Sequence, residues 1–226
     1  MTPRARPLAV LCLAGVLAAG CAAASPAAAP ASATATASIL FQDDFSNPNS
    51  GWNKETGADE TTNYDHGQYL IAVQQPSVDV WAEPGLDLTD VALQVQTQLA
   101  GGPVDNEFGV MCRYQRGGDG KNSFYFFLIS SDGYYALGKV SKDVRTILSP
   151  AQGSPQPSKA IQPQTEAINQ LDATCQGSHM ALSVNGTAVG DFNDGELTRG
   201  DIGLIAGTYD EGGVMIHFDN LVARRP

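Results

Sequence analysis

The sequence predicts an all-β protein, a sandwich of two antiparallel sheets that follows an export signal and a linker. Between residues 39 and 224, short runs alternate between apolar and polar residues with a period of two, and Gly, Asp, Asn and Pro separate them. The same stretch shows no convincing helical periodicity. About a dozen short strands in one domain of this length indicate two stacked sheets.

Each expected strand is an alternating run bounded by turn residues. The strands span 39–45, 68–73, 78–82, 91–99, 107–114, 124–130, 134–140, 169–175, 179–185, 187–192, 201–207 and 214–222. Asp132-Gly133 and Asn185-Gly186 can each supply the positive backbone dihedrals of a tight hairpin turn, so hairpins are expected at both. The Pro-, Gln- and Ser-rich stretch 149–166 is expected to form a long loop across one edge or mouth of the sandwich.

Strand parity predicts which side chains point between the sheets. The predicted core faces hold Phe108, Val110, Cys112 and Tyr114, then Leu171, Ala173 and Cys175, then Met180, Leu182 and Val184, then Val214, Ile216 and Phe218. The run 124–129 breaks this rule, because both of its faces are apolar: Phe124, Phe126 and Leu128 on one, Tyr125, Phe127 and Ile129 on the other. One set belongs to the core, and the other lies under the 149–166 loop or lines a ligand groove.

The first twenty residues have the features of an export signal. Arg4 and Arg6 precede an apolar run that ends in small residues and is too short to span a bilayer. The segment from Leu17 to Cys21 resembles a bacterial lipobox, in which the signal is cut before a cysteine that then carries lipid, although Leu17 sits one place further from the cysteine than usual. We therefore expect residues 1–20 to be a lipoprotein signal peptide and Cys21 to be lipidated, with ordinary secretion as the alternative.

Residues 21–38 are rich in Ala, Pro, Ser and Thr and contain no charged, aromatic or large aliphatic residue. Such a segment cannot build a core, so we expect a disordered linker that holds the domain of residues 39–226 away from the membrane. The expected location is the cell surface or the periplasm, with the lipid on Cys21 as the only membrane attachment.

The cysteine content fits an oxidising compartment. Cys12 leaves with the signal and Cys21 would carry lipid, so Cys112 and Cys175 remain as one pair. Both fall on predicted core faces, and we expect a disulfide between them, with two buried free thiols as the alternative.

The charge balance excludes some partners. The chain has 13 basic and 24 acidic residues, and removal of the signal takes two of the basic ones and none of the acidic ones. The remaining basic residues are scattered, which argues against binding nucleic acid or anionic lipid head groups through charge.

Seven spaced stretches together resemble the concanavalin A-like lectin and glucanase superfamily, in particular the exported bacterial domains related to laminin-G and keto-disaccharide-hydrolase types. The stretches are DDFSNPNSGW, WAEPGLDLTDV, EFGVMCRYQ, NSFYFFLISSDGYYALGKV, LSVNGTAVGDF, GDIGLIAGT and FDNLV, and the resemblance covers residues 39–224. It implies a jelly-roll sandwich with a concave sheet that is used for ligands. It is poorly specific for activity, because this fold hosts lectins, glycosidases and interaction modules.

Some members of this superfamily hold a structural calcium where the first and last strands meet. The matching acidic positions are Asp43 or Asp44 and Asp219, and carboxylate oxygens suit Ca²⁺. The resemblance thus implies a possible calcium at Asp44 and Asp219; the alternative is that these carboxylates cap turns or pair with Arg224.

The residues favour binding over catalysis. Glycosidases of the glucanase branch carry closely spaced acidic residues on one strand, and no Glu-x-Asp-x-Glu array occurs. No HExxH, GxSxG or other metal or nucleophile pattern occurs either. Trp52 and Asp79 are noted in case the protein is a hydrolase, without an assigned role.

Sugars offer flat C–H faces to aromatic rings and hydroxyls to polar side chains. Parity places several such residues away from the core, and we expect one groove on the concave sheet lined by Trp81, Glu107, Arg113, Tyr125 and His217. The alternative is that they are ordinary surface residues. The sequence thus favours a membrane-anchored, non-catalytic module that binds a carbohydrate or a cell-envelope partner, over a glycoside hydrolase or a structural interaction module.

Overall fold

The computed structural model describes residues 38–226 apart from 152 and 164. The expected signal peptide, the lipidation site Cys21 and all of the linker except Ser38 lie outside these residues. The described part of the chain is all-β, with two antiparallel sheets and no helix, as predicted. It accordingly offers no helix that could cross a bilayer.

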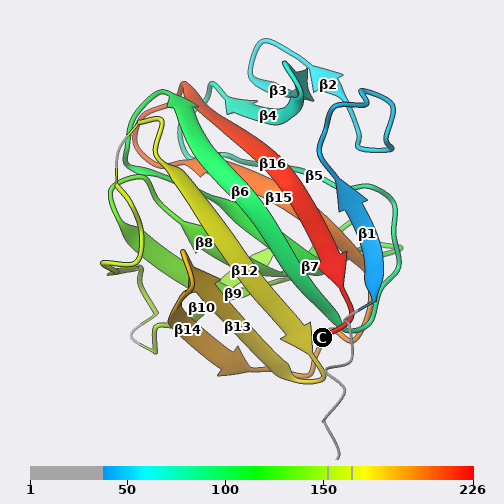
Figure 1. Ribbon diagram of the computed structural model, residues 1–226. Coiled ribbons are helices and arrows are strands. Elements are labelled where there is room, and N and C mark those ends of the chain that lie inside the picture. Colours follow the sequence, from blue (N-terminus) through cyan, green and yellow to red (C-terminus); the bar gives the residue numbers. More distant parts are fainter. Residues whose placement is uncertain (1–37, 152, 164) are drawn as a thin grey trace, which may run out of the picture. The chain divides into compact units, whose positions relative to one another are not determined.

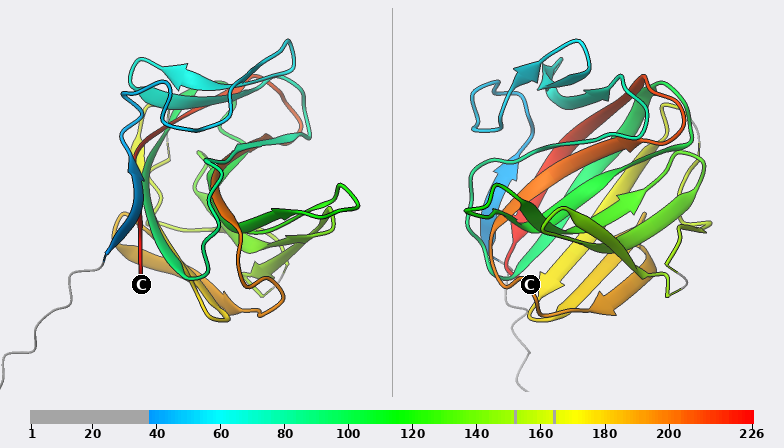
Figure 2. Two further views of the ribbon diagram at one scale, coloured as in Figure 1. Left: turned by 90° about the vertical axis from the view of Figure 1, so that its right-hand side faces the viewer. Right: turned by 180° about the vertical axis from the view of Figure 1, so that it is seen from behind.

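The two sheets form two layers (Figures 1 and 2). Sheet A runs β14 (Thr187–Asn193), β13 (His179–Val184), β12 (Ile168–Gln176), β6 (Val91–Gly101), β16 (Val214–Arg224), β4 (Gln68–Val73), β3 (Glu60–Asp65) and β2 (Glu55–Thr56), with β1 (Ile39–Asp43) also on β16. Sheet B runs β10 (Val144–Ser149), β9 (Tyr134–Ser141), β8 (Asn122–Ile129), β7 (Asn106–Arg116), β15 (Asp201–Thr208) and β5 (Asp79–Ala82), with β11 (Gln156–Pro157) on β9.

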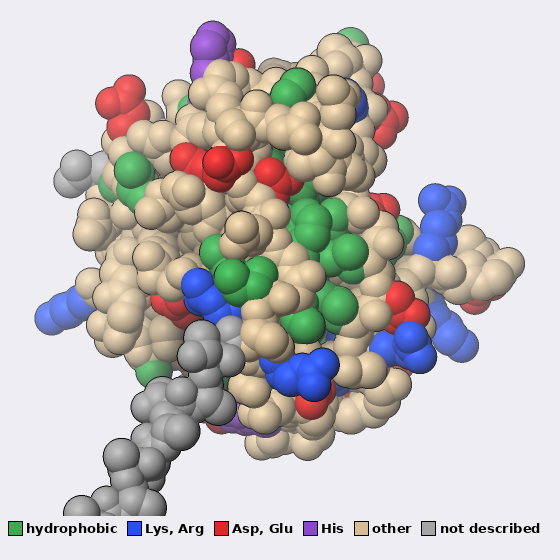
Figure 3. Space-filling view, turned by 45° about the vertical axis from the view of Figure 1, so that its right-hand side comes forward, with side chains coloured by type: hydrophobic (Ala, Val, Ile, Leu, Met, Phe, Trp, Pro, Cys, Tyr) green, Lys and Arg blue, Asp and Glu red, His purple; other side chains and the backbone are tan. Residues whose placement is uncertain are grey.

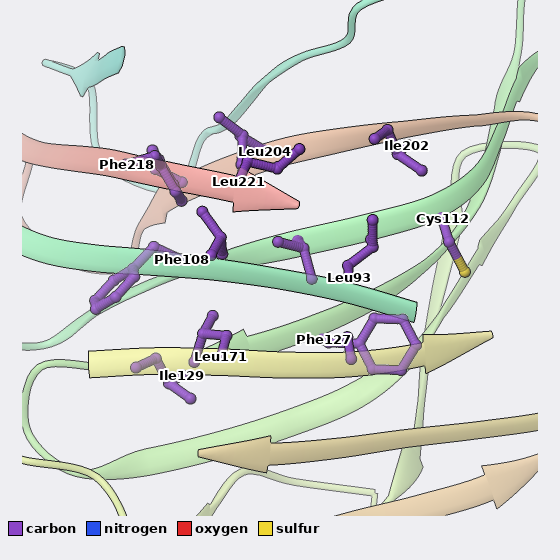
Figure 4. Packing of buried hydrophobic residues seen from close by; sticks show 14 of the residues in the cluster. Leu93, Phe108, Cys112, Phe127, Ile129, Leu171, Ile202, Leu204, Phe218 and Leu221 are labelled. Carbon is purple, nitrogen blue, oxygen red and sulfur yellow. The ribbon is translucent and has the colours of Figure 1, made fainter. Parts of the chain in front are cut away.

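Alternation along the strands builds the core between the sheets. On β6, Val91, Leu93 and Val95 are buried, while Gln94 and Gln96 between them lie half-exposed on the outer face. This is the period-two pattern of a strand with one wet face. Side chains from β6, β12 and β16 of sheet A meet those from β7, β8 and β15 of sheet B in one cluster (Figure 4).

A disulfide between Cys112 on β7 and Cys175 on β12 links sheet B to sheet A, with the two Cα atoms 6.8 Å apart. The parity prediction placed both sulfurs correctly, and the alternative of two free thiols is wrong. The core face of Tyr114 was predicted wrongly. The pairing of β7 with β8 shifts between Cys112 and Gln115, and Arg113 has a φ of +56°, so this β-bulge turns Tyr114 to the outer face of sheet B.

The two predicted tight turns differ. Asn185 and Gly186 have φ values of +50° and +77° between β13 and β14, which is the two-residue hairpin expected of this pair. Between β8 and β9 the connection is longer, from Ser130 to Gly133, and Ser130 N–H bonds the Tyr134 carbonyl at 2.8 Å. Asp132-Gly133 is therefore part of a four-residue loop.

The outer surface is mainly polar. On the face seen in Figure 3, hydrophobic side chains gather near the middle, with acidic side chains above them and basic ones below. The large hydrophobic side chains that are most exposed are spread over several elements: Ile39, Val104, Tyr134, Val144, Ile168 and Met215.

Candidate ligand-binding site

The outer face of sheet B carries a second apolar cluster, separate from the core between the sheets. Phe124, Phe126 and Leu128 of β8 belong to it, whereas Tyr125, Phe127 and Ile129 belong to the main core. Met111, Ala136 and Ile205 on neighbouring strands complete the second cluster. The double-sided apolar pattern of β8 therefore reflects two apolar environments, one on each face of the sheet.

The loop 149–166 reaches this second face at Pro155, which lines a cavity together with Leu128 and Ala136. Its Ile161 is buried in the main core and Ala160 packs against the same core. Both alternatives that the sequence left open therefore hold in part: the loop borders one end of the second face, and the rest of the outer face of sheet B remains as the candidate groove.

Sheet B is strongly curved, with its outer face concave. Arg145 lies on β10 and Asp79 on β5, the opposite edges of the sheet, yet Arg145 Nη1 is 3.4 Å from Asp79 Oδ2. In a flat sheet, six strands about 4.8 Å apart would hold these positions more than 20 Å apart. The curvature also brings Arg145 onto Glu107 of β7, in a two-pronged pair whose Nη2–Oε2 distance is 2.7 Å.

Gly207 of β15 lies between the two carboxylates, because it pairs with Asp79 on one side and with Glu107 on the other. A Cβ at Gly207 would lie 2.1 Å from Asp79 Oδ1 and 3.1 Å from Glu107 Cγ. Glycine therefore leaves the space in which the two carboxyl groups meet.

The two carboxyl groups titrate in opposite directions. Burial, followed by the charge of Glu107, raises the pKa of Asp79 to about 7, so Asp79 can carry the proton that the pair shares. Burial also works on Glu107, but the hydrogen bonds and charge of Arg145 outweigh it and lower the pKa of Glu107. Tyr209 donates a further bond to Glu107 Oε2 at 2.7 Å. Glu107 is thus a buried anion with three side-chain partners: Arg145, Asp79 and Tyr209.

Three aromatic rings gather at another part of the concave face. The Trp81 ring centroid lies 5.8 Å from that of Phe124 and 6.3 Å from that of Tyr114. Phe124 is buried, whereas Trp81 and Tyr114 are only partly buried. The two outer rings thus present apolar surface to solvent, with the Tyr114 hydroxyl bonded to Asn122 Oδ1 at 3.1 Å.

A cavity of about 460 Å³ opens beside Glu107 and Tyr209. Its volume falls in the range of about 300 to 1,000 Å³ that is typical of small-ligand sites. The wall combines tyrosine rings, small apolar groups and carboxylates: Asp105, Glu107, Leu128, Ile129, Ser130, Asp132, Tyr134, Tyr135, Ala136, Pro155, Tyr209 and Asp210.

Two of the five residues predicted to line one groove lie on this face. Trp81 belongs to the aromatic group and Glu107 lines the cavity. His217 lies instead on sheet A, where its Nε2 is 3.1 Å from Asp65 Oδ2. The expectation that all five share one groove is therefore wrong, while ligand binding by Trp81 and Glu107 stays a prediction.

Arg113 and Tyr125 have structural surroundings. Arg113 is buried, and its guanidinium donates to the carbonyls of Thr89, Gly177 and Leu197 and to Asp90. Tyr125 is fully buried in the main core, and its hydroxyl donates to Asp194 Oδ1 at 2.6 Å. Strand alternation predicted the wrong face for both residues. Arg113 lies at the β-bulge in β7, and on β8, which carries Tyr125, both faces are equally apolar.

Sequence reasoning missed Arg145, Tyr209 and the cavity tyrosines. Arg145 lies on β10, a strand that was not predicted because VRTILS has no clear alternation. Asp79 was noted without a role. One signal could have indicated that Asp79 and Glu107 lie close together: a glycine, Gly207, pairs with both of them across neighbouring strands. This signal can be recognised only when the order of the strands in the sheet is known.

The expected calcium residues lie near the junction of β1 and β16. Asp44 is exposed and accepts hydrogen bonds from the backbone N–H and the hydroxyl of Ser46. Burial, together with the nearby charge of Asp44, raises the pKa of Asp219. Two carboxylates supply few of the six to eight oxygens that Ca²⁺ takes. In residues 38–226, apart from 152 and 164, no group of three or more His, Cys, Asp or Glu side chains is arranged to hold a metal. Calcium here stays a prediction.

Comparisons with known proteins identify the fold. No protein-family model matches the sequence, and neither does any curated protein sequence. Among solved structures, the carbohydrate-binding module CBM66 from Bacillus subtilis matches with a TM-score of 0.60 at 12% identity, over 77% of this chain and 96% of that one. A Bacillus licheniformis β-glucanase matches with a TM-score of 0.58 at 13% identity, over 82% and 97%.

A Bacillus subtilis protein of unknown function with a galectin-like fold matches with a TM-score of 0.63 at 10% identity, over 83% of this chain and 96% of that one. The domain has the concanavalin A-like jelly-roll fold. Both the resemblance in the sequence and the predicted architecture are confirmed at the level of the fold.

Proposed function

We propose that this protein is an exported, non-catalytic carbohydrate-binding module that holds its ligand on the concave outer face of sheet B. One observation carries the proposal: this face carries partly exposed aromatic rings and, beyond Arg145, a 460 Å³ cavity lined by tyrosines and carboxylates. Rings can stack on the C–H faces of sugars, and carboxylates accept hydrogen bonds from sugar hydroxyls.

The fold supports this proposal without identifying the ligand. One similar structure is named as a carbohydrate-binding module, and others as a β-glucanase, an endo-1,3-β-glucanase and a β-1,3-1,4-glucanase. These names guide the choice of first probes: β-1,3-glucan and mixed-linkage β-1,3-1,4-glucan.

A glycoside hydrolase is the second candidate, and the Asp79–Glu107 pair favours it. Two neighbouring carboxyl groups whose pKa values are pushed apart are typical of an acid and base pair. Against it, these two groups hydrogen-bond to each other, whereas the two carboxyl groups of a glycosidase stand about 5 to 10 Å apart around the scissile bond. Glu107 is also fully engaged by Arg145 and Tyr209.

The test is a glycan array probed with the purified full chain, together with the two glucans in solution. We expect binding without release of new reducing ends, and weaker binding by Tyr134→Ala, which removes an exposed ring from the cavity. Ile168→Ala is the matched control, since it removes an exposed apolar side chain from sheet A. Release of reducing ends that Asp79→Asn abolishes would favour the hydrolase. Silence across the array would refute sugar binding and leave an envelope protein as the partner to seek by crosslinking.

Export and anchoring are part of the proposal. The lipobox-like segment ending at Cys21 supports lipidation, and the Ala- and Pro-rich linker supports display away from the membrane. Cys21→Ser should move the protein from the membrane fraction to the soluble fraction of the envelope. Continued membrane association of that variant would refute the lipid anchor.

A further inference from the structure

The Arg145 side chain crosses the concave face of sheet B. It starts from β10 at one edge, and its guanidinium carbon lies 4.8 Å from the centre of the Phe126 ring, in the middle of the face. It ends on Glu107 and Asp79, toward the opposite edge. Stacking on an aromatic ring and pairing with two carboxylates hold this side chain in place.

Arg145 separates the aromatic group from the cavity. Along β8, Phe126 lies between Phe124, which packs on Trp81, and Leu128, which lines the cavity. A side chain above Phe126 therefore stands between these two regions.

The floor beneath Arg145 is closed to a ligand. Phe126, Met111 and Ile205 all lie on the outer face of sheet B, yet each is at most 2% exposed. A sugar chain could not lie along this floor as it would along an open groove. The exposed parts of the face are the ends, with the Trp81 group on one side of Arg145 and the cavity on the other.

We propose that the cavity takes the terminal sugar of a glycan and that Arg145, with Glu107 and Tyr209, forms the wall against which the chain ends. This inference rests on the proposed carbohydrate-binding function and narrows it from glycans in general to glycan ends. Tyr134, which is 40% exposed at the cavity, offers its ring to the sugar face.

The charge of the cavity narrows the terminal sugar further. Asp105, Asp132 and Asp210 line it with Glu107, and the one cation at its wall, Arg145, is already paired with Glu107. Burial, followed by the charges of Asp132 and Asp210, raises the pKa of Asp105. A terminal sugar that is uncharged or carries an amino group fits this wall, and a uronic acid or sulfated sugar does not.

The experiment counts bound protein molecules per glycan chain. Isothermal titration of the full chain is carried out with β-1,3-glucan, mixed-linkage β-1,3-1,4-glucan and any polysaccharide positive on the array, each as the polymer and as a length-sorted digest. We expect a constant number of proteins per chain whatever its length. A number that grows with chain length would overturn the inference while leaving carbohydrate binding intact. Absence of binding to every polymer and digest would overturn the proposed function itself, and with it this inference.

Two variants test the wall and the cavity separately. Tyr134→Ala should weaken binding of the short chains about tenfold, as loss of one stacked ring does. Val144→Ala, which removes a 65% exposed side chain from β10, is the matched control. Unchanged affinity of Tyr134→Ala would refute the cavity as the binding site.

The wall is tested with the double variant Arg145→Ala/Glu107→Gln, which removes Arg145 without leaving a buried charge unpaired. Circular dichroism shows whether the variant keeps its fold. A folded double variant should bind several copies along each long chain, because the two regions become continuous. If it still binds a constant number per chain, Arg145 is not the wall.

Discussion

Arg145 and Asp79 lie on the two edge strands of sheet B, and their side chains are nevertheless in ion-pair contact at 3.4 Å. Only a sheet rolled onto its own outer face can bring its edges together in this way. The contact explains why large apolar side chains on that face are buried, and it ties the proposed site to the stability of the sheet.

Removal of Arg145 should destabilise the protein. Glu107 has a side chain only 5% exposed, and in Arg145→Ala its charge loses its cationic partner. Breaking a buried pair on one side costs about 3 kcal/mol or more, and we expect a loss near 3 kcal/mol in the free energy of unfolding, measured with urea.

The control for this variant is Arg199→Ala. Arg199 and Asp87 form an equally direct pair, but both side chains are about 60% exposed. Exposed pairs contribute little, so Arg199→Ala should leave the urea midpoint unchanged. Equal effects of the two substitutions would show that Glu107 is not held as a buried anion.

The pair of Asp79 and Glu107 should make stability depend on pH near neutrality. The pKa of Asp79 rises from an ordinary value of 3.8 to about 7 on folding, so between these values the folded state binds a proton that the unfolded state does not. The stabilisation is therefore fully present below pH 4 and is lost as the pH rises through 7. The melting temperature should fall between pH 5 and pH 8.

Asp79→Asn isolates this contribution, because the amide keeps the shape and cannot ionise. The fall in melting temperature between pH 5 and pH 8 should be smaller in the variant than in the natural protein. Parallel curves for the two proteins would show that Asp79 titrates elsewhere.

Gly207→Ala should separate the two carboxyl groups. The added methyl would lie 2.1 Å from Asp79 Oδ1, so at least one carboxylate must move. Overpacking of this kind costs about 1 to 3 kcal/mol, which urea unfolding can measure. Gly118→Ala is the control, since a Cβ there meets nothing within 4 Å and its φ is not positive. A neutral Gly207→Ala would mean that the carboxyl groups can meet without this space.

Sequence patterns predicted the sandwich because burial on alternate residues is a local property of each strand. They placed Cys112 and Cys175 correctly for the same reason. Arg113 does not lie on the face that strand alternation predicts, because a β-bulge shifts the pairing of β7 with β8. The sequence of β7 alone does not indicate this bulge. The contact of Arg145 with Glu107 depends on the curvature of a whole sheet, which is a property of all its strands together.

The disulfide should carry a large part of the stability. It closes a loop with a sequence separation of 63 residues and joins β7 of sheet B to β12 of sheet A. In the chain-entropy model, a loop of this length stabilises the folded state by about 4 kcal/mol. Urea unfolding of Cys112→Ala/Cys175→Ala, compared with the oxidised natural protein, measures this difference, and Ala at both sites leaves no unpaired thiol. The double variant keeps a second link, because Arg113 follows Cys112 directly and donates hydrogen bonds to the carbonyls of Thr89, Gly177 and Leu197. If the double variant unfolds at the same urea concentration as the natural protein, packing and the Arg113 bonds hold the two sheets together without the covalent link.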